Sequence, residues 1–385
     1  MRLAPLRLPW ESGHVRIEVE RKDFLTTALD ALPRDDKDWR KTWRFTFKGE
    51  PARDAGGVAR EFWSLLSAEL FHPHAGLFKY SANENLTYQI NPLAPVLHTP
   101  EAAQRLFRLA GRLLAKALLD KQLVTVSLNR PLLKHILGAP VTFDDLELID
   151  AELYRNLQWI LTCGPGEVEY TCQTFAVDEQ ELGDAVSSVD LIPGGSEVDV
   201  TDENKAEFVT ARFKYTMMDR IQVPLGSLLA GFYDVVPHKV LEGGDVREKV
   251  DAQELEVVLC GTPEIDVADW KAHTEYAGGL AAFRGVGSYF WRVIDNDFDE
   301  DQRTRMLQFV TGTSRLPAGG FKNLQGVDGK NKKFKLHGIG GNNDTVPISH
   351  TCFNRLDLPS YSSYEHARLV LTNLVACDVE GFSVD

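Results

Sequence analysis

Apolar residues recur at helical spacing in several long stretches of the chain. The stretch after Gly56-Gly57 is amphipathic, which predicts a turn followed by a helix. Residues 100–121 repeat the pattern, with Pro100 at the first helical position and Thr99 as a helix N-cap. Further helical segments are expected at 141–161, with Asp144 or Asp150 as start signals, at 203–232 with an interruption at Pro224, and at 267–275, 299–310 and 362–377.

Shorter segments have strand-like patterns. Residues 15–32 begin with alternating charged and apolar positions before they take helical spacing, and residues 44–50 alternate over a short length. Residues 164–179 suggest a turn and a strand, and residues 191–209 suggest a hairpin followed by a helix capped near Thr201 or Asp202. Helices and short strands alternate without a regular strand–helix–strand repeat. The expected fold class is therefore α+β.

One segment has the character of a domain boundary. The strongly apolar residues Leu255–Cys260 end in Gly261-Thr262-Pro263. Glycine has unusual conformational freedom and proline cannot continue a hydrogen-bonded ladder, so a short connector is expected there. A length of 385 residues suits two or three compact domains. We therefore expect two lobes, residues 1–260 and 264–385, joined by a hinge at 261–263.

Composition narrows the class of protein. The chain is 43% apolar and 25% charged and contains no uninterrupted apolar run of membrane-spanning length, so no membrane span is expected. Its formal net charge of −14 disfavours nucleic-acid binding and suits a partner with a basic face. The lysines at 330, 332, 333 and 335 form a local basic run, which we interpret as a solvated hairpin.

The five cysteines are scattered, and no C-x-x-C pair is present. This pattern argues against a disulfide framework or a zinc ribbon, so no metal site is expected. It favours a reducing compartment, here the cytoplasm with the nucleus as a further location.

Cys352 is the best candidate for a reactive group. It lies between His350 and Asn354, and an extended backbone would place these three side chains on one face. An imidazole near the sulfur would favour the thiolate, which is the nucleophilic form. A buried inert thiol is the alternative to a nucleophile, and a nucleophilic cysteine could also belong to a thiol protease or a disulfide oxidoreductase. The protease would place its partner residues far apart in sequence, and the oxidoreductase would need a second nearby cysteine.

Longer motifs around this cysteine resemble one known family. HTCFNRLDLPSY at 350–361 and FVTGTSRLPAGGF at 309–321 resemble signatures of HECT ubiquitin ligases. FKGEPARDAGGVAREFW, RLAGRLLAKAL and GGSEVDVTDENKAEFV occur earlier in the chain in the family's order. The resemblance runs from about residue 15 to the C-terminus, and it is specific because the motifs are long and collinear.

The resemblance implies a bilobal fold and a defined chemistry. A large, mostly helical N-lobe would bind a charged ubiquitin-conjugating enzyme, and a smaller C-lobe would carry Cys352 on the far side of the hinge. Ubiquitin would pass to Cys352 as a thioester and then to a lysine of a protein substrate. No metal or organic cofactor is implied, because the incoming thioester is already activated. The competing interpretation is an inactive scaffold that binds the conjugating enzyme or ubiquitin.

The resemblance also assigns roles to individual residues. Thr351 matches the residue beside the nucleophile and would help hold the thioester carbonyl, while His350 would position the loop or tune the thiol. Phe382 matches a phenylalanine of the family's C-terminal tail that supports transfer. Asp385 would add carboxylates near the incoming lysine.

A small subdomain, about residues 152–215, would hold the groove for the conjugating enzyme. The apolar wall of that groove is expected to consist of Leu157, Leu161, Phe175 and Phe208. The chain departs from the family where some members hold a second, noncovalent ubiquitin on aromatic residues, because Leu86 and Met217 occupy those positions. No substrate-recognition module precedes residue 15. Recognition is therefore expected from a larger chain or from another source.

Overall fold

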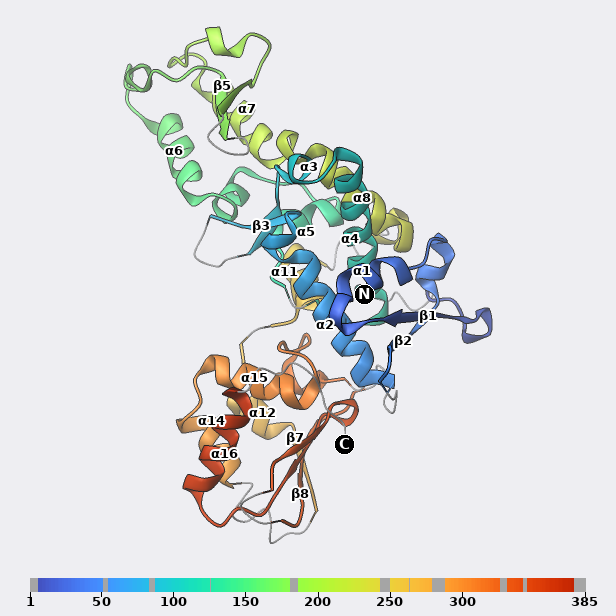
Figure 1. Cartoon of the computed structure of the whole chain (residues 1–385). Coiled ribbons are helices and arrows are strands. Elements are labelled where there is room, and N and C mark those ends of the chain that lie inside the picture. The colour runs from blue at the N-terminus through green and yellow to red at the C-terminus, as the bar shows by residue number, and fades with distance from the viewer. Residues whose placement is uncertain are drawn as a thin grey trace. The chain divides into compact units, whose positions relative to one another are not determined.

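The computed structural model describes residues 6–50, 55–82, 87–124, 126–180, 186–242, 250–262, 264–278, 288–325, 331–341 and 345–376. The chain divides into two compact units. Unit 1 consists essentially of Glu69–Ala115 and Val126–Glu256, and unit 2 consists of Arg2–Ala68, Lys116–Thr125 and Val257–Asp385. Each unit is described separately below, and Figure 1 labels their elements.

The N-terminal part of unit 2 is a strand–helix–strand arrangement. Strands β1 (His14–Val19) and β2 (Thr42–Phe47) pair in parallel and are connected through α1 (Phe24–Ala31). In both strands the buried positions alternate with exposed ones, as the period of a half-buried strand requires. Phe24 and Phe45 pack on Phe62 of α2 (Ala55–Phe71) with ring centroids 5.5 and 4.4 Å apart.

The C-terminal part of unit 2 is built on a four-stranded sheet. Its order is β7-β8-β10-β9, in which β8 pairs in parallel with both β7 and β10 while β9 runs antiparallel to β10. Helices α14 and α16 lie side by side against one side of this sheet (Figure 1). The strands are β7 (Thr274–Gly278), β8 (Phe334–Gly338), β9 (Ile348–His350) and β10 (Arg355–Leu358), and the helices are α12 (Val267–Ala272), α14 (Ser288–Asn296), α15 (Glu300–Thr311) and α16 (Tyr364–Ala376).

Aromatic packing organises the core beneath this sheet. Trp270 is fully buried and its ring stacks on Phe321, with the centroids 4.9 Å apart. Phe290 and Phe334 meet the same indole edge-on. Burial of such large rings supplies most of the favourable free energy of a small domain, so this cluster holds the helices on the sheet.

Unit 1 is mainly helical. Its longest helix, α4 (Pro100–Asp120), continues into unit 2 after Ala115. Within unit 1, α4 crosses α8 (Gln222–Val235) so closely that Gly111 and Gly231 each face backbone of the other helix. Thr99 caps α4 as expected, because its Oγ1 accepts from Ala102 N at 3.3 Å. The remaining regular elements around this pair are β3 (Phe78–Tyr80), β4 (Tyr88–Ile90), α3 (Ala94–Leu97), α5 (Arg130–Leu137), α9 (His238–Glu242) and α11 (Ala252–Cys260), the last of which continues into unit 2.

A smaller group of elements in unit 1 has its own core. Helices α6 (Ala151–Thr162) and α7 (Lys205–Met217) pack together beside the antiparallel pair β5 (Ala176–Gln180) and β6 (Val186–Asp190). Asp150 caps α6, since its Oδ1 accepts from Leu153 N at 2.9 Å. The core of this group contains Leu146, Leu157, Ile160, Val168, Phe175, Val200, Phe208, Val209 and Met217.

Three expected features differ in the structure. The helical stretch 203–232 breaks at 218–221 and not at Pro224, because Pro224 lies in the first turn of α8, where a missing N–H costs nothing. Residues 191–200 form a turn containing the short 3-10 segment Gly195–Glu197, not a hairpin. The basic run expected as a solvated hairpin agrees only in part: an antiparallel bridge joins Gln325 and Asn331, but the run then continues into β8, an interior strand whose Phe334 and Leu336 are buried.

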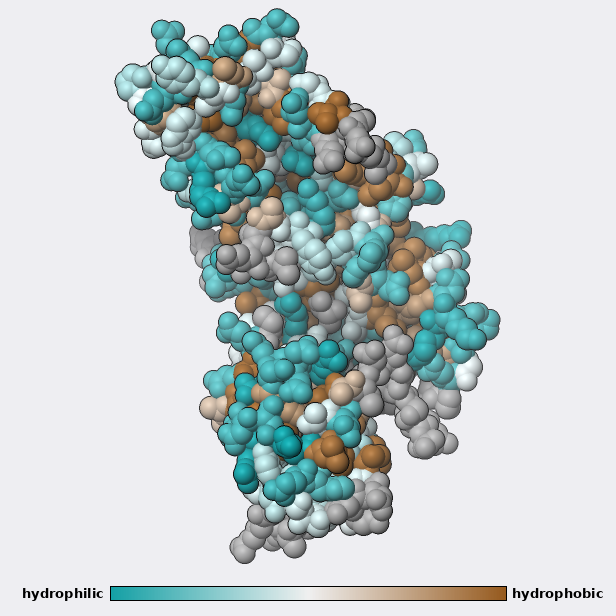
Figure 2. Space-filling model, turned by 60° about the vertical axis from the view of Figure 1, so that its left-hand side comes forward, coloured by the Kyte–Doolittle hydropathy of each residue, from teal (hydrophilic) through white to brown (hydrophobic). Residues whose placement is uncertain are grey.

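The fold class is α+β, as expected, with many helices and small sheets. Among the described residues, no helix combines the length and the apolar character needed to cross a bilayer. On the face drawn in Figure 2, hydrophobic residues form separate groups within a largely hydrophilic surface, in keeping with the acidic, charge-rich composition.

Candidate active site

Cys352 lies in a tight reversal between two strands. Strand β9 ends at His350, Thr351–Phe353 form the 3-10 turn η12, and β10 begins at Arg355. His350 and Arg355 are paired across the antiparallel ladder, so the turn connects adjacent strands. The expectation of an extended backbone with residues 350, 352 and 354 on one face is therefore wrong. The chain turns through the left-handed conformation of Asn354, whose φ is 48°.

Asn354 anchors this turn. Its side chain is 0% exposed, and its Nδ2 donates to the carbonyl of Gln325 at 3.0 Å and to that of Lys332 at 2.7 Å. Its own carbonyl accepts from Lys335 N at 2.8 Å, which links the turn to β8. Asparagine tolerates the left-handed region better than most residues because its side chain is short and polar. The amide therefore holds the turn that carries Cys352.

The ring of His350 binds a carboxylate of the neighbouring strand. His350 Nε2 lies 3.1 Å from Asp357 Oδ2, and the His350 side chain is 41% exposed. Asp357 also accepts two hydrogen bonds from the guanidinium of Arg355, and its Oδ1 lies 3.1 Å from His337 Nδ1. Asp357 and Arg355 are residues for which pattern reasoning offered no role. Their pairing could have been inferred from β10, in which the charged residues Arg355 and Asp357 alternate with the apolar Leu356.

Burial and hydrogen bonding act in opposite directions on Asp357. Burial raises the pKa of its carboxyl group, but hydrogen bonds from Arg355 and His350 outweigh burial and hold the pKa below its ordinary value. The group is therefore an anion at neutral pH. Among the described residues no set of His, Cys, Asp and Glu side chains is arranged to hold a metal ion, and in this cluster the guanidinium of Arg355 already neutralises Asp357.

Asn354 does not have the role that an asparagine plays in a thiol protease. In such a site an asparagine or aspartate would orient the histidine that serves the cysteine. Here Asn354 Nδ2 donates to two backbone carbonyls and Asn354 Oδ1 accepts from Arg60 Nη1 at 2.9 Å, while Asp357 is the residue beside His350. Thr351, the residue before the cysteine, is buried, whereas Phe353 after it is exposed beneath the ammonium of Lys332.

The four residues predicted to line the groove for the conjugating enzyme separate into two groups. Leu157, Phe175 and Phe208 are buried in the small core of unit 1, with the rings of Phe175 and Phe208 in edge contact at 5.4 Å. They cannot contact a partner directly without opening that core. Leu161, by contrast, is 41% exposed on the last turn of α6. Trp159, also on α6, is 46% exposed.

The structure describes two of the three predicted hinge residues, Gly261 and Thr262. Gly261 follows α11 with φ of 67°, and a Cβ at this position would meet the carbonyl oxygen of Leu316 at 2.5 Å. Thr262 and Leu316 exchange two backbone hydrogen bonds of 2.8 and 3.0 Å. The position therefore requires glycine. Pro263, and the tail residues Phe382 and Asp385, lie outside the described residues.

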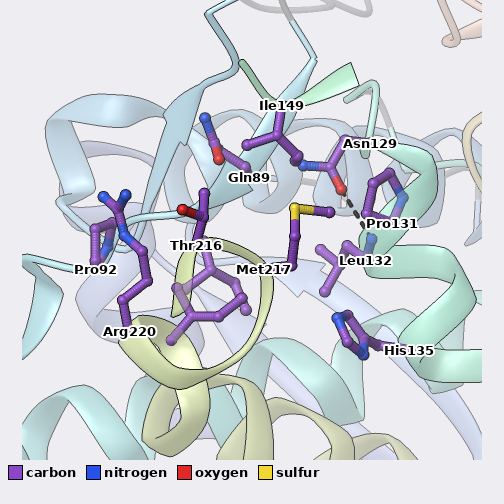
Figure 3. Close-up of a pocket in the computed structure, with 12 residues that line it drawn as sticks. Gln89, Pro92, Asn129, Pro131, Leu132, His135, Ile149, Thr216, Met217 and Arg220 are labelled. Atoms are coloured by element: carbon purple, nitrogen blue, oxygen red, sulfur yellow. Dashed lines mark hydrogen bonds between the residues drawn. The ribbon is translucent and has the colours of Figure 1, made fainter. Parts of the chain in front are cut away.

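Unit 1 also contains a cavity of about 40 Å³ (Figure 3). His135 and Met217 line it, and His135 Nε2 is buried without a hydrogen-bond partner among the described residues. Burial lowers the pKa of His135, although a hydrogen bond with the backbone of Met217 opposes this effect. No cysteine or carboxylate lines the cavity, and the hydroxyl of Thr216, which does line it, donates to Arg212 O at 2.9 Å. Met217 occupies a position that the resemblance relates to a ubiquitin exosite, and Leu86 lies outside the described residues.

Comparison with known proteins places this site in a family. The model of the HECT-domain (ubiquitin-transferase) matches residues 64–385. The E3 ubiquitin-protein ligase RSP5 of Saccharomyces cerevisiae is 37% identical over 362 residues, which are 94% of this chain and 43% of that protein. RSP5 of Chaetomium thermophilum is 37% identical over 367 residues, 94% of this chain and 43% of that protein.

The E3 ubiquitin-protein ligase NEDD4 of Homo sapiens is 37% identical over 347 residues, 90% of this chain and 24% of that protein. The chain thus spans less than half the length of these curated relatives. The matched family model runs through the strands, turn and helix that surround Cys352. Because that model covers most of the sequence, the chain belongs to the HECT-domain (ubiquitin-transferase) family.

Proposed function

We propose that this chain is the catalytic region of a ubiquitin-protein ligase. Cys352 accepts ubiquitin as a thioester from a charged conjugating enzyme and passes it to a lysine of a protein substrate. The observation that carries the proposal is membership of the HECT-domain family through the region that presents Cys352 in a tight turn.

The proposed chemistry consists of two acyl transfers. In the first, the Cys352 thiolate attacks the thioester carbonyl of ubiquitin, and the cysteine thiolate of the conjugating enzyme leaves. In the second, a neutral lysine amine attacks the new thioester, the Cys352 thiolate leaves, and the lysine proton passes to a base. Both bonds that break are thioesters, so the reaction needs neither a metal nor an organic cofactor.

Roles follow for the residues around the turn. His350 positions the loop or tunes the thiol, and Thr351 helps to hold the thioester carbonyl. The tail, with Phe382 and Asp385, supports the transfer to lysine and supplies carboxylates near the incoming amine. These assignments come from the family resemblance, and the exposure of the His350 ring supports its access to a reacting group.

The two transfers require Cys352 to meet different partners. We propose that residues 1–260 form an N-lobe, that 264–385 form a C-lobe, and that 261–263 are the hinge between them. The left-handed Gly261 supports this assignment, because glycine lets the chain leave α11 in a direction that other residues resist. The small group around α6 and α7, within about 152–215, receives the conjugating enzyme.

The setting of the proposed activity follows from thiol chemistry. Cys163, Cys172 and Cys260 are free thiols. Free thiols, together with a reactive cysteine, suit a reducing compartment. We therefore place the activity in the cytoplasm, with the nucleus as a further location.

An inactive scaffold that binds the conjugating enzyme or ubiquitin is the competing function. The ordered turn favours an enzyme, because a scaffold has no need of a buried asparagine that fixes the cysteine or of a carboxylate that holds the neighbouring histidine.

One experiment separates the two functions. The chain is incubated with activating enzyme, a panel of charged conjugating enzymes and labelled ubiquitin, and the products are run on gels with and without thiol reductant. A ligase forms a reductant-sensitive ubiquitin adduct that Cys352→Ala abolishes. No adduct across the panel, or an adduct that survives in Cys352→Ala, would contradict the proposal.

A second prediction concerns the binding surface of α6. Replacing Leu161 with alanine is expected to weaken binding of the conjugating enzyme about tenfold, because an exposed apolar anchor is lost without a change in the core. Titration of labelled conjugating enzyme measures the affinity.

Trp159→Ala is the matched control for Leu161→Ala. Residues two apart on a helix lie about 200° apart around its axis, so Trp159 faces another side of α6. Trp159→Ala is expected to leave the affinity within about twofold of the unmodified chain. The reverse result, with binding lost only in Trp159→Ala, would move the partner to the other side of the helix.

A further inference from the structure

Three strands bring four polar side chains together next to the turn of Cys352. His337 of β8 stands beside Asp357 of β10 in the parallel ladder, and His350 ends the neighbouring strand β9. Asp357 receives the fork of Arg355, while each of its oxygens also lies 3.1 Å from a histidine ring nitrogen. The carboxylate is nearly buried, and His350 is the more exposed of the two histidines.

This geometry constrains the protonation of His350. An ionised carboxylate can only accept hydrogen bonds, so the contact between His350 Nε2 and Asp357 Oδ2 requires a hydrogen on Nε2. In the neutral ring the lone pair then lies on Nδ1. Asp357 is the only hydrogen-bond partner of the His350 ring among the described residues. Nδ1 is therefore the ring atom left to accept a proton.

We propose that Asp357 is a positioning residue for the nucleophile: it holds His350 in the Nε2–H tautomer so that Nδ1 takes the proton from the Cys352 thiol. This inference rests on the proposed function of Cys352. The proton moves from Sγ to Nδ1 as the thiolate forms, and the resulting imidazolium stays bound to the carboxylate of Asp357 through its other N–H. The proton then passes to the departing thiolate of the conjugating enzyme.

Arg355 and His337 have different parts in the cluster. The bidentate guanidinium of Arg355 keeps Asp357 ionised, which the tautomer preference requires. His337 Nδ1 lies 3.1 Å from both Asp357 Oδ1 and Arg355 Nη2, and it can donate to the first or accept from the second but not both. His337 is therefore not needed to orient His350. Outside this group, Lys335 stands beside Arg355 in the ladder and pairs with Glu275 of β7. Arg60 of α2 binds the turn itself, since its Nη1 donates to Thr351 O at 3.1 Å and to Asn354 Oδ1 at 2.9 Å.

The test measures the reactivity of Cys352 in the absence of ubiquitin. The whole chain is treated with iodoacetamide across a pH series, and alkylation of the peptide that contains Cys352 is followed by mass spectrometry. Asp357→Asn keeps the size of the side chain but removes its charge. It is expected to move the midpoint of the rate profile up by about one pH unit, which lowers the alkylation rate near pH 7 about tenfold. His350→Asn is expected to have a similar effect.

The double variant distinguishes positioning from a general loss of structure. If Asp357 acts through His350, adding Asp357→Asn to His350→Asn causes no further change in the rate profile. A structural role would instead lower the rate equally in both backgrounds, and that result overturns the inference. His337→Asn is the matched control, because it removes the other histidine on the same carboxylate. It is expected to leave the midpoint unchanged, and an equal shift in this variant also counts against the proposal.

The role of Asp357 and the proposed ligase function can be disproved separately. An unchanged alkylation midpoint in Asp357→Asn, together with a normal ubiquitin adduct on Cys352, removes the role of Asp357 and leaves the ligase intact. A shifted midpoint without any ubiquitin adduct means that the thiol is activated as inferred but that the proposed ligase function is wrong. Thermal unfolding of each variant shows whether its sheet remains folded.

Discussion

Replacing Asn354 with alanine is expected to destabilise the C-terminal part of unit 2 by about 3 kcal/mol and to prevent stable presentation of Cys352. Alanine removes the amide that donates to Gln325 O and Lys332 O, which leaves two carbonyls without that donor. It also places a residue with a Cβ at φ of 48° without the local hydrogen bonding that helps asparagine there. Thermal unfolding and the yield of ubiquitin adduct measure the two effects.

Two further variants of Asn354 separate the causes. Asn354→Gly also loses the amide but tolerates the left-handed backbone, so it should be more stable than Asn354→Ala by about 1 kcal/mol. Asn354→Asp keeps the shape and the acceptor for Arg60 Nη1 but sets one carboxylate oxygen against two carbonyl oxygens, and it is expected to be less stable than the unmodified chain. Stability equal to that of the unmodified chain in all three variants would show that the turn does not depend on this side chain.

Gly111→Ala is the second change with a large expected effect. Alanine normally favours a helix over glycine by about 1 kcal/mol. Here the new Cβ would lie 1.9 Å from the carbonyl oxygen of Leu228 in α8, so the two helices must separate. Separation disrupts close packing along α4 and α8 and is expected to cost about 3 kcal/mol. Gly231→Ala should behave alike, since its Cβ would meet Arg108 O at 1.8 Å. The midpoint of thermal unfolding is the measurement.

The same helix supplies the matched control. Gly226 also lies within α8, but apart from the adjacent backbone of its own helix no atom stands within 4 Å of a Cβ built there. Gly226→Ala is therefore expected to stabilise the chain by up to about 1 kcal/mol through helix propensity alone. If Gly111→Ala raises the midpoint of unfolding as Gly226→Ala does, α4 and α8 do not approach each other as closely as described.

The helices were the most predictable part of the fold. The signals of α4 and α6 are local, since the period of their apolar residues and their caps at Thr99 and Asp150 depend on residues only a few positions away. The break between α7 and α8 was misplaced because proline was read as an interruption. The energetic cost of a proline depends on how far it lies from the first residue of its helix. The packing of unit 1 sets the position where α8 begins.

The sequence indicated a candidate nucleophile but not the residues that surround it. Long collinear motifs drew attention to Cys352. The strand β8 was missed because lysines mask the alternation of Phe334 and Leu336 with Lys335 and His337. With β8 misread as a hairpin, nothing placed His337 beside Asp357, twenty positions further along the chain. Parallel strands are not connected by a short turn, so the sequence contains no local signal that two distant segments pair.

The sequence by itself determined the family, the candidate nucleophile and the main helices, because motifs, caps and periodicity are properties of neighbouring residues. Only the tertiary structure decided which partner His350 binds, that Asn354 anchors the turn, and that Leu161 is exposed while Leu157, one helical turn away, is buried. These outcomes depend on which surfaces of distant elements meet. A pattern of apolar positions specifies that one face of an element is buried, but not which other element covers it. Contacts between segments far apart in the chain decide that.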